Sequence, residues 1–181
     1  MGLASGLLLA GLLVGCSPTH NWRSVGFEGA SVQALLPCKP ESAQREVPLA
    51  GPDQPPLKLQ MLSCDVGSLT FAVSAVRLPD AGLSKAVQAN WRRAAWASLK
   101  QAVQPDAQAP AGWSTQPVRL LGGVEAQHWS GPGLNHRQQT IQAHLQWQEA
   151  AGWLVQAAVY GPVADIDSTV LDSFMSGLKL R

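Results

Sequence analysis

The sequence predicts an α+β fold: an antiparallel β-sheet of about six to seven strands, one long helix between two β-meanders, and a C-terminal helix packed on the sheet. Three observations lead to this fold class. Apolar residues alternate with a period of two in both halves of the chain, take helical spacing in the middle, and return to helical spacing near the C-terminus. Such an order is typical of a sheet covered by helices.

Four strands are expected before the middle helix. Their ranges are 31–36, 42–49, 57–64 and 68–78. Pro37 ends the first of them, because proline has no backbone donor for a sheet. The short segment 65–67 is a turn, and Phe71 and Val73 then share one face of the fourth strand. The last two strands are therefore expected to form a hairpin.

The middle helix is expected over residues 82–103, with Asp80 as its N-cap. Apolar residues recur there at steps of three and four positions, whereas Arg92, Arg93 and Lys100 fall on other faces. The apolar positions are Leu83, Val87, Trp91, Ala94, Ala95, Leu99 and Ala102. We expect this helix to pack on the sheet with its apolar stripe.

The second half is expected to form an antiparallel meander followed by a helix. A strand over 117–129 contains the pair Gly122-Gly123, which predicts a bulge or a bend. The segment 131–133 is expected to turn the chain. The next strand, 140–148, has the clearest alternation in the sequence, with Ile141, Ala143, Leu145 and Trp147 on one face.

The last long strand is expected over 153–160, and Gly161-Pro162 ends it. Helical spacing follows from about residue 164, with Asp165 and Asp167 near the positive end of the helix dipole and Lys179 and Arg181 near its negative end. The apolar positions of this helix are Ile166, Val170, Leu171, Phe174, Met175 and Leu178. The positions of the charged residues and the spacing of the apolar residues both predict a C-terminal helix.

The N-terminus carries an uncharged apolar segment that ends in Leu13-Val14-Gly15-Cys16. It resembles the lipobox of bacterial lipoproteins, in which the chain is cut before the cysteine and the cysteine is acylated. A membrane-spanning helix needs about 20 apolar residues, and this segment turns polar sooner. No Lys or Arg precedes Arg23, although signal peptides normally begin with a basic region. Either the natural start lies upstream of Met1 or the amino terminus alone supplies the charge.

The resemblance implies three parts: a signal peptide over 1–15, a lipidated end and short tether over 16–22, and one α+β domain over 23–181. The protein would then be held in the cell envelope, facing the periplasm, by acyl chains such as palmitate on Cys16. Two or more chains anchor a protein stably. Ser17 stands where Asp would favour the inner membrane, so the outer membrane is expected. Palmitate incorporation that depends on Cys16 tests this assignment.

Two cysteines remain once Cys16 is acylated, and an even pair in an exported chain predicts a disulfide between Cys38 and Cys64. The expected hairpin places Cys64 at a strand end, within reach of Cys38. A metal or redox pair is disfavoured, because there is no Cys-x-x-Cys and no histidine at ligand spacing from either cysteine.

Composition argues against nucleic-acid binding and against catalysis. The formal net charge is +1 and no basic cluster is longer than Arg92-Arg93, whereas a nucleic-acid surface needs several cations on one face. The sequence has no Gly-x-Ser-x-Gly, no His-Glu-x-x-His, no phosphate-binding loop ending in Lys and no dinucleotide fingerprint. We therefore expect a protein that is not an enzyme and needs no cofactor.

Histidines and tryptophans supply the candidate binding residues. A turn at 131–133 would place His128 and His136 on neighbouring strands, where two imidazoles could ligate a metal. His144 lies too far along the strand from His136 to share that ion, so solvated histidines and no metal site are expected. Most of the seven tryptophans are expected in the core. Trp113 and Trp129, near loops, are the candidates for a binding surface.

Four short motifs spread over residues 22–181 carry a second resemblance, to the PsbP/DcrB-type fold found in many bacterial lipoproteins. They are Leu35-Leu36-Pro37, Gly152-Trp153-Leu154, Gly161-Pro162 and Asp172-Ser173-Phe174. Many members of that group are non-catalytic partners of larger assemblies or uncharacterised, and the resemblance supplies no catalytic residue.

Two functions from different classes remain open. The first is a lipoprotein that docks to another envelope protein through an exposed sheet face or edge strand. The second is a module that binds a small ligand or a glycan in a tryptophan-lined pocket between the sheet and the helix. Stoichiometric capture of one envelope protein would favour docking, and tryptophan quenching by small ligands would favour a pocket.

Overall fold

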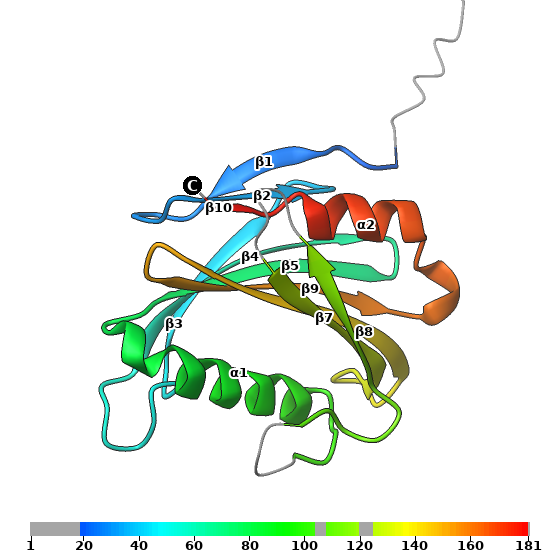
Figure 1. Ribbon diagram of the computed structural model, residues 1–181. Helices are drawn as coiled ribbons and strands as arrows, with labels where there is room; N and C mark the ends of the chain where they lie inside the picture. The colour runs from blue at the N-terminus through cyan, green and yellow to red at the C-terminus, as the bar shows by residue number, and fades with distance from the viewer. Residues whose placement is uncertain (1–18, 104–107, 120–124, 181) are drawn as a thin grey trace, which may run out of the picture.

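The computed structural model describes residues 19–103, 108–119 and 125–180. Cys16, the signal segment and Gly122-Gly123 lie outside the described residues. Strands dominate the described part and form two antiparallel sheets (Figure 1). The large sheet has the order β3-β4-β5-β9-β8-β7-β6 and the small sheet the order β1-β2-β10.

The bounds of the strands in the small sheet are β1 (Arg23–Gly26), β2 (Val32–Leu36) and β10 (Lys179–Leu180). Those of the large sheet are β3 (Glu41–Val47), β4 (Leu57–Val66), β5 (Leu69–Arg77), β6 (Ser114–Arg119), β7 (Glu125–Leu134), β8 (Thr140–Ala150) and β9 (Trp153–Gly161). The α-helices are α1 (Ser84–Ser98) and α2 (Ser168–Ser176), and 3₁₀ turns η1 (Ala81–Leu83) and η2 (Val163–Asp165) precede them.

The prediction of an α+β fold with one long helix was wrong. The described chain is mostly β, with a seven-stranded antiparallel sheet, a smaller sheet packed against it and two short helices. The error has a physical origin: the alternation of single strands reveals a sheet, but a second sheet built from β1, β2 and β10 depends on contacts between the two ends of the chain.

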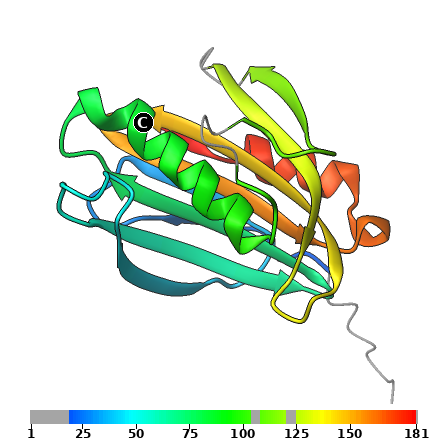
Figure 2. The same ribbon diagram turned by 90° about the horizontal axis from the view of Figure 1, so that it is seen from below.

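Three layers result, with the large sheet in the middle (Figures 1 and 2). Helix α1 covers one face of this sheet, and the small sheet and α2 cover the other. Each face has its own apolar core. Val87 and Trp96 of α1 pack with Leu145 on the first face, whereas Leu36 of β2 and Phe174 of α2 pack with Phe71 on the second.

Helix α1 is shorter than the predicted 82–103. Lys100 takes a left-handed backbone conformation with φ of 59°. The amide of Gln101 then donates to the carbonyl of Trp96 at 2.9 Å, and that of Lys100 donates to Ala97 at 3.1 Å. These two bonds form the pattern that closes a helix and satisfies its last carbonyls. Periodicity cannot reveal such a cap, because apolar residues continue to Ala102.

The predicted turn at 131–133 was also wrong. Strand β7 continues through these residues to Leu134, and the chain reverses over 135–139. Asn135 forms this turn because its side-chain Oδ1 accepts hydrogen bonds from the amides of Arg137 at 2.9 Å and Gln139 at 3.0 Å. Glycine and proline therefore lie inside a strand here.

The C-terminal helix, expected from about residue 164, is shorter: it begins at Ser168, and Asp167 caps it. The carboxylate of Asp167 accepts from the amides of Thr169 at 2.7 Å and Val170 at 3.1 Å, and these bonds lower the pKa of Asp167. The helix ends at Ser176, and β10 then pairs with β2. No helix in the described residues has the length and apolarity that crossing a bilayer requires.

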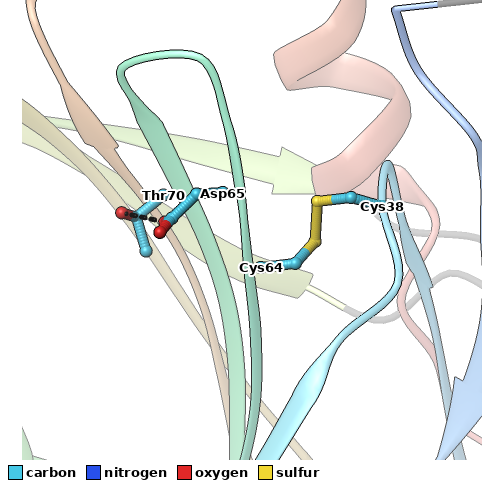
Figure 3. The surroundings of a disulfide bond; sticks show 4 residues. All are labelled: Cys38, Cys64, Asp65 and Thr70. Atoms are coloured by element: carbon cyan, nitrogen blue, oxygen red, sulfur yellow. Dashed lines mark hydrogen bonds between the residues drawn. A yellow bond between two sulfur atoms is a disulfide. The ribbon is translucent and has the colours of Figure 1, made fainter.

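The structure joins Cys38 and Cys64 in a disulfide with a Cα–Cα distance of 5.9 Å (Figure 3). Cys38 follows β2 of the small sheet, and Cys64 lies in β4 of the large sheet. Beside it, the Thr70 hydroxyl donates to the Asp65 carboxylate at 2.6 Å across the β4–β5 hairpin. The disulfide therefore fixes the point where the chain passes from one sheet to the other.

Candidate functional site

Tryptophans separate α1 from the large sheet. Trp96 of α1 is fully buried, and its ring meets Trp129 of β7 edge to face at a centroid distance of 5.7 Å. Trp113, just before β6, meets the other side of Trp96 at 6.2 Å. Trp91 of α1 and Trp147 of β8 belong to the same core cluster. Because indoles are large, this packing holds the helix away from the strands and leaves open space along both of its flanks.

Trp113 is held in place by β7. Its indole N–H donates to the carbonyl of Pro132 at 3.1 Å. A Cβ at Gly131 would lie 2.4 Å from the nearest atom of the Trp113 ring, so only glycine allows the ring to lie this close. The Gly131-Pro132-Gly133 segment is thus part of strand β7, and the Trp113 ring packs directly against it.

A cleft of about 820 Å³ opens on one flank of α1, between this helix and strands β6, β7 and β8. This volume lies in the range of small-molecule binding sites. Its lining residues come from the helix and the three strands: Lys85, Gln88, Arg92, Pro117, Val118, Arg119, Ala126, Gln127, Trp129, Trp147, Gln148 and Glu149. We call this space the α1–β8 cleft.

The helix supplies a polar stripe to the α1–β8 cleft. Lys85, Gln88 and Arg92 are three and four positions apart, so they share one side of α1. The strands contribute the rings of Trp129 and Trp147, which expose only 9% and 3% of their surfaces. Polar side chains such as Gln127 and Gln148 line the same side. The helix side is thus polar and cationic, and the strand side combines aromatic and polar groups.

Three residues that line the α1–β8 cleft have a buried donor without a partner among the described residues. These donors are the indole Nε1–H of Trp147, the Nε–H of Arg92 and the side-chain amide Nε2 of Gln148. A buried donor with no acceptor costs free energy, and most such donors in proteins are paired. An acceptor placed in the cleft would remove this cost.

Arg92 is the central cation of the site. Its guanidinium carbon lies 5.6 Å from the centroid of the Trp129 ring, a cation–π arrangement. Burial, together with the neighbouring charge of Arg93, lowers the pKa of Arg92. The only carboxylate among the described lining residues is Glu149, which already accepts a hydrogen bond from the Ser84 hydroxyl at the start of α1.

A second cavity of about 680 Å³ lies on the other flank of α1, against β3, β4 and β5. Its walls are more apolar and include Leu49, Leu59 and Trp91, and Arg45 is its one charged lining residue in the described part. It offers fewer polar groups than the α1–β8 cleft.

The structure separates the four residues proposed as a binding surface. Trp129 lies at the wall of the α1–β8 cleft, and Trp113 is a half-buried neighbour of Trp96. His128 lies on the opposite face of the sheet, beside His144. His136 lies in the exposed turn after β7 and lines another cavity. The expected pairing of His128 with His136 failed because β7 continues past residue 132.

His128 and His144 form a pair on neighbouring strands, with Nε2 of His128 3.1 Å from Nδ1 of His144. Burial lowers the pKa of both imidazoles, although Asp172 of α2 raises that of His128. The adjacent His128 adds to the effect on His144, whose pKa falls to about 4. The folded protein therefore holds both rings neutral at neutral pH.

The stability of the fold should consequently fall in mild acid. Between about pH 6.5 and the lower pKa values of the folded state, the two histidines bind protons in the unfolded chain but stay neutral in the folded chain. Stability is fully present above about pH 6.5 and is lost as the pH falls towards about 4. Urea unfolding of wild type and His144→Gln across this range measures the effect, and the variant should lose less stability. An equal loss in both would contradict this cause.

Of the residues that line the cleft, the sequence analysis selected only Trp129 as a binding residue. Trp147 was assigned to the core on its alternation with Leu145, and the structure places it there and also at the cleft wall. The stripe of Lys85, Gln88 and Arg92 was visible as helical spacing, but nothing in the sequence showed what it would face.

Comparison with known proteins adds little. No protein-family profile matches the chain, and no curated protein matches it. Among solved structures, the protein of unknown function PA94 from Pseudomonas aeruginosa is similar at 12% identity, with a TM-score of 0.44 over 88% of this chain and 97% of that chain. Similarity at this level assigns neither a family nor a function.

Proposed function

We propose that this protein is a non-catalytic lipoprotein of the bacterial cell envelope whose domain binds a small ligand in the α1–β8 cleft. The proposed location in the cell envelope rests on the resemblance of the segment before Cys16 to a lipobox. The binding role rests on the cleft itself, which has the size of a ligand site and combines two tryptophans with polar and cationic side chains. The Cys38–Cys64 disulfide suits an exported domain.

The observation that carries the binding role is the Trp147 indole N–H. Trp147 lines the cleft, and its indole nitrogen is buried without an acceptor among the described residues, as is that of Trp96 in the neighbouring core. Most buried donors in native proteins have a hydrogen-bond partner. A ligand acceptor accounts for both the donor and the space beside it.

We expect the fluorescent dye 1-anilinonaphthalene-8-sulfonate to bind at one site per chain, with energy transfer from tryptophan. Trp147→Phe keeps a ring in the wall but removes the donor, so it should weaken binding by about tenfold, the loss of one hydrogen bond to a charged group. Trp153→Phe is the matched control, because Trp153 packs in the core on the opposite face of the sheet. Equal affinity of wild type and Trp147→Phe would contradict the proposal.

Docking to another envelope protein is the second candidate, and strand β3 favours it. This strand lies at the edge of the large sheet, and its residues are exposed along almost its whole length. An exposed edge can accept a strand from a partner. Stoichiometric capture of one protein from detergent-solubilised envelopes supports docking, and a chain that binds the dye but captures no partner argues against it.

A further inference from the structure

We infer that the α1–β8 cleft takes an amphipathic oxyanion, a ligand with a carboxylate, sulfonate or phosphate head near Arg92 and an apolar or aromatic body against Trp129 and Trp147. This inference rests on the proposed function, because it assigns a ligand class to the same cleft. The charges, the unpartnered donors and the apolar residues that line the cleft lead to it.

The charges around the cleft favour an anion. Lys85 and Arg92 of α1 and Arg119 of β6 line it, against the single carboxylate of Glu149 among the described lining residues. Three cations thus face one carboxylate, which also accepts a hydrogen bond from Ser84. Cations gathered in a cleft with low-dielectric walls concentrate anionic ligands there.

Arg92 fixes where the anionic head would lie. Its guanidinium is half-buried and stacked on Trp129, yet its Nε–H has no acceptor among the described residues. A desolvated guanidinium gains most from a planar or multidentate oxyanion, which forms charge-assisted hydrogen bonds. The indole N–H of Trp147 and the side-chain amide of Gln148 are two further donors at this cleft without an acceptor among the described residues.

The apolar residues on the strand side favour a ligand that also has an apolar body. The apolar residues there include Trp129, Trp147, Ala126 and Val118, and the polar ones are Arg119, Gln127, Gln148 and Glu149. An inorganic anion alone would leave the apolar residues without contact, and a neutral apolar molecule would leave Arg92 without an acceptor. Only a molecule with both parts satisfies Arg92 and the apolar residues together.

Two related dyes separate these cases. The anionic 1-anilinonaphthalene-8-sulfonate and the neutral N-phenyl-1-naphthylamine differ in the sulfonate, so wild type should bind the anionic dye about tenfold more tightly. Arg92→Gln should lower the affinity for the anionic dye about tenfold while changing that for the neutral dye by less than about twofold. Arg92→Lys should retain only part of the affinity, because the ammonium keeps the charge but loses the multidentate hydrogen bonds and the stacking on Trp129. Arg45→Gln, at the second cavity, is the matched control and should change neither.

The other possible results of the dye-binding experiment would contradict either the anionic ligand class or the proposed function. Equal affinity for both dyes, or no effect of Arg92→Gln on the anionic dye, overturns the anionic class but leaves ligand binding intact. Binding of neither dye overturns the proposed function as well. A loss with Arg45→Gln places the anion in the second cavity and overturns the assignment.

Competition then identifies the source of the head group. Displacement of the anionic dye by decanoate indicates a soluble amphiphile, and displacement by vesicles of phosphatidylglycerol indicates a membrane lipid; either supports the inference. Displacement by inorganic phosphate as strongly as by decanoate overturns the amphipathic requirement, and displacement by none of the three overturns the ligand class.

Discussion

Trp96→Ala should lower the free energy of unfolding by about 3–5 kcal/mol, the usual cost of removing a large aromatic side chain from a core. Trp96 is fully buried and meets both Trp113 and Trp129 edge to face. Its removal would leave a void at the centre of the packing that supports α1. Urea unfolding followed by far-ultraviolet circular dichroism measures the change.

The matched comparison is Trp22→Ala, because Trp22 is only partly buried at the edge of the other core. It should cost clearly less than Trp96→Ala, since less area is lost from the interior. If both substitutions cost the same, or if Trp96→Ala costs under about 1 kcal/mol, the indole cluster does not support the helix as described.

Loss of the Cys38–Cys64 disulfide should destabilise the fold by about 3.5 kcal/mol on the chain-entropy account, given a sequence separation of 26 residues. The double variant Cys38→Ser/Cys64→Ser removes the cross-link and leaves no unpaired thiol at either position. Urea unfolding with and without a reducing agent measures the effect.

The reducing agent supplies the control for this second prediction. It should shift the unfolding midpoint of the wild type towards that of the double variant and leave the double variant unchanged. A wild type whose midpoint is insensitive to full reduction would show that the disulfide contributes little beyond the packing of the two sheets.

Local pattern predicted much of the sheet. Strands β2 and β8 follow the alternation of apolar residues, because one side of each faces an apolar core. Strands β5 and β9 are nearly continuous apolar runs, because both of their faces meet a core. Strands β1 and β10 were missed, since they are short and pair with β2 from opposite ends of the chain. The order of strands across a sheet, like the presence of a second sheet, is a long-range property that no short window of sequence contains.

Less of the candidate site than of the fold could be predicted from the sequence. The tryptophans were found as a set, but whether each lies in a core or at a wall depends on where α1 crosses the sheet. Gly131 and Gly133 were taken for a turn, whereas Gly131 lies directly beneath the Trp113 ring and Gly133 close to Leu99. A glycine needed for close approach and a glycine needed for a turn look the same in a sequence.

The central claim is that the indole N–H of Trp147 faces a ligand in the α1–β8 cleft. The most direct test follows the seven indole N–H signals of ¹⁵N-tryptophan-labelled protein by nuclear magnetic resonance during titration with 1-anilinonaphthalene-8-sulfonate, with Trp147 assigned through Trp147→Phe. The account predicts that the Trp147 signal shifts most and saturates at one dye per chain, while the Trp153 signal stays in place. A Trp147 signal that does not move while the dye binds elsewhere would contradict it.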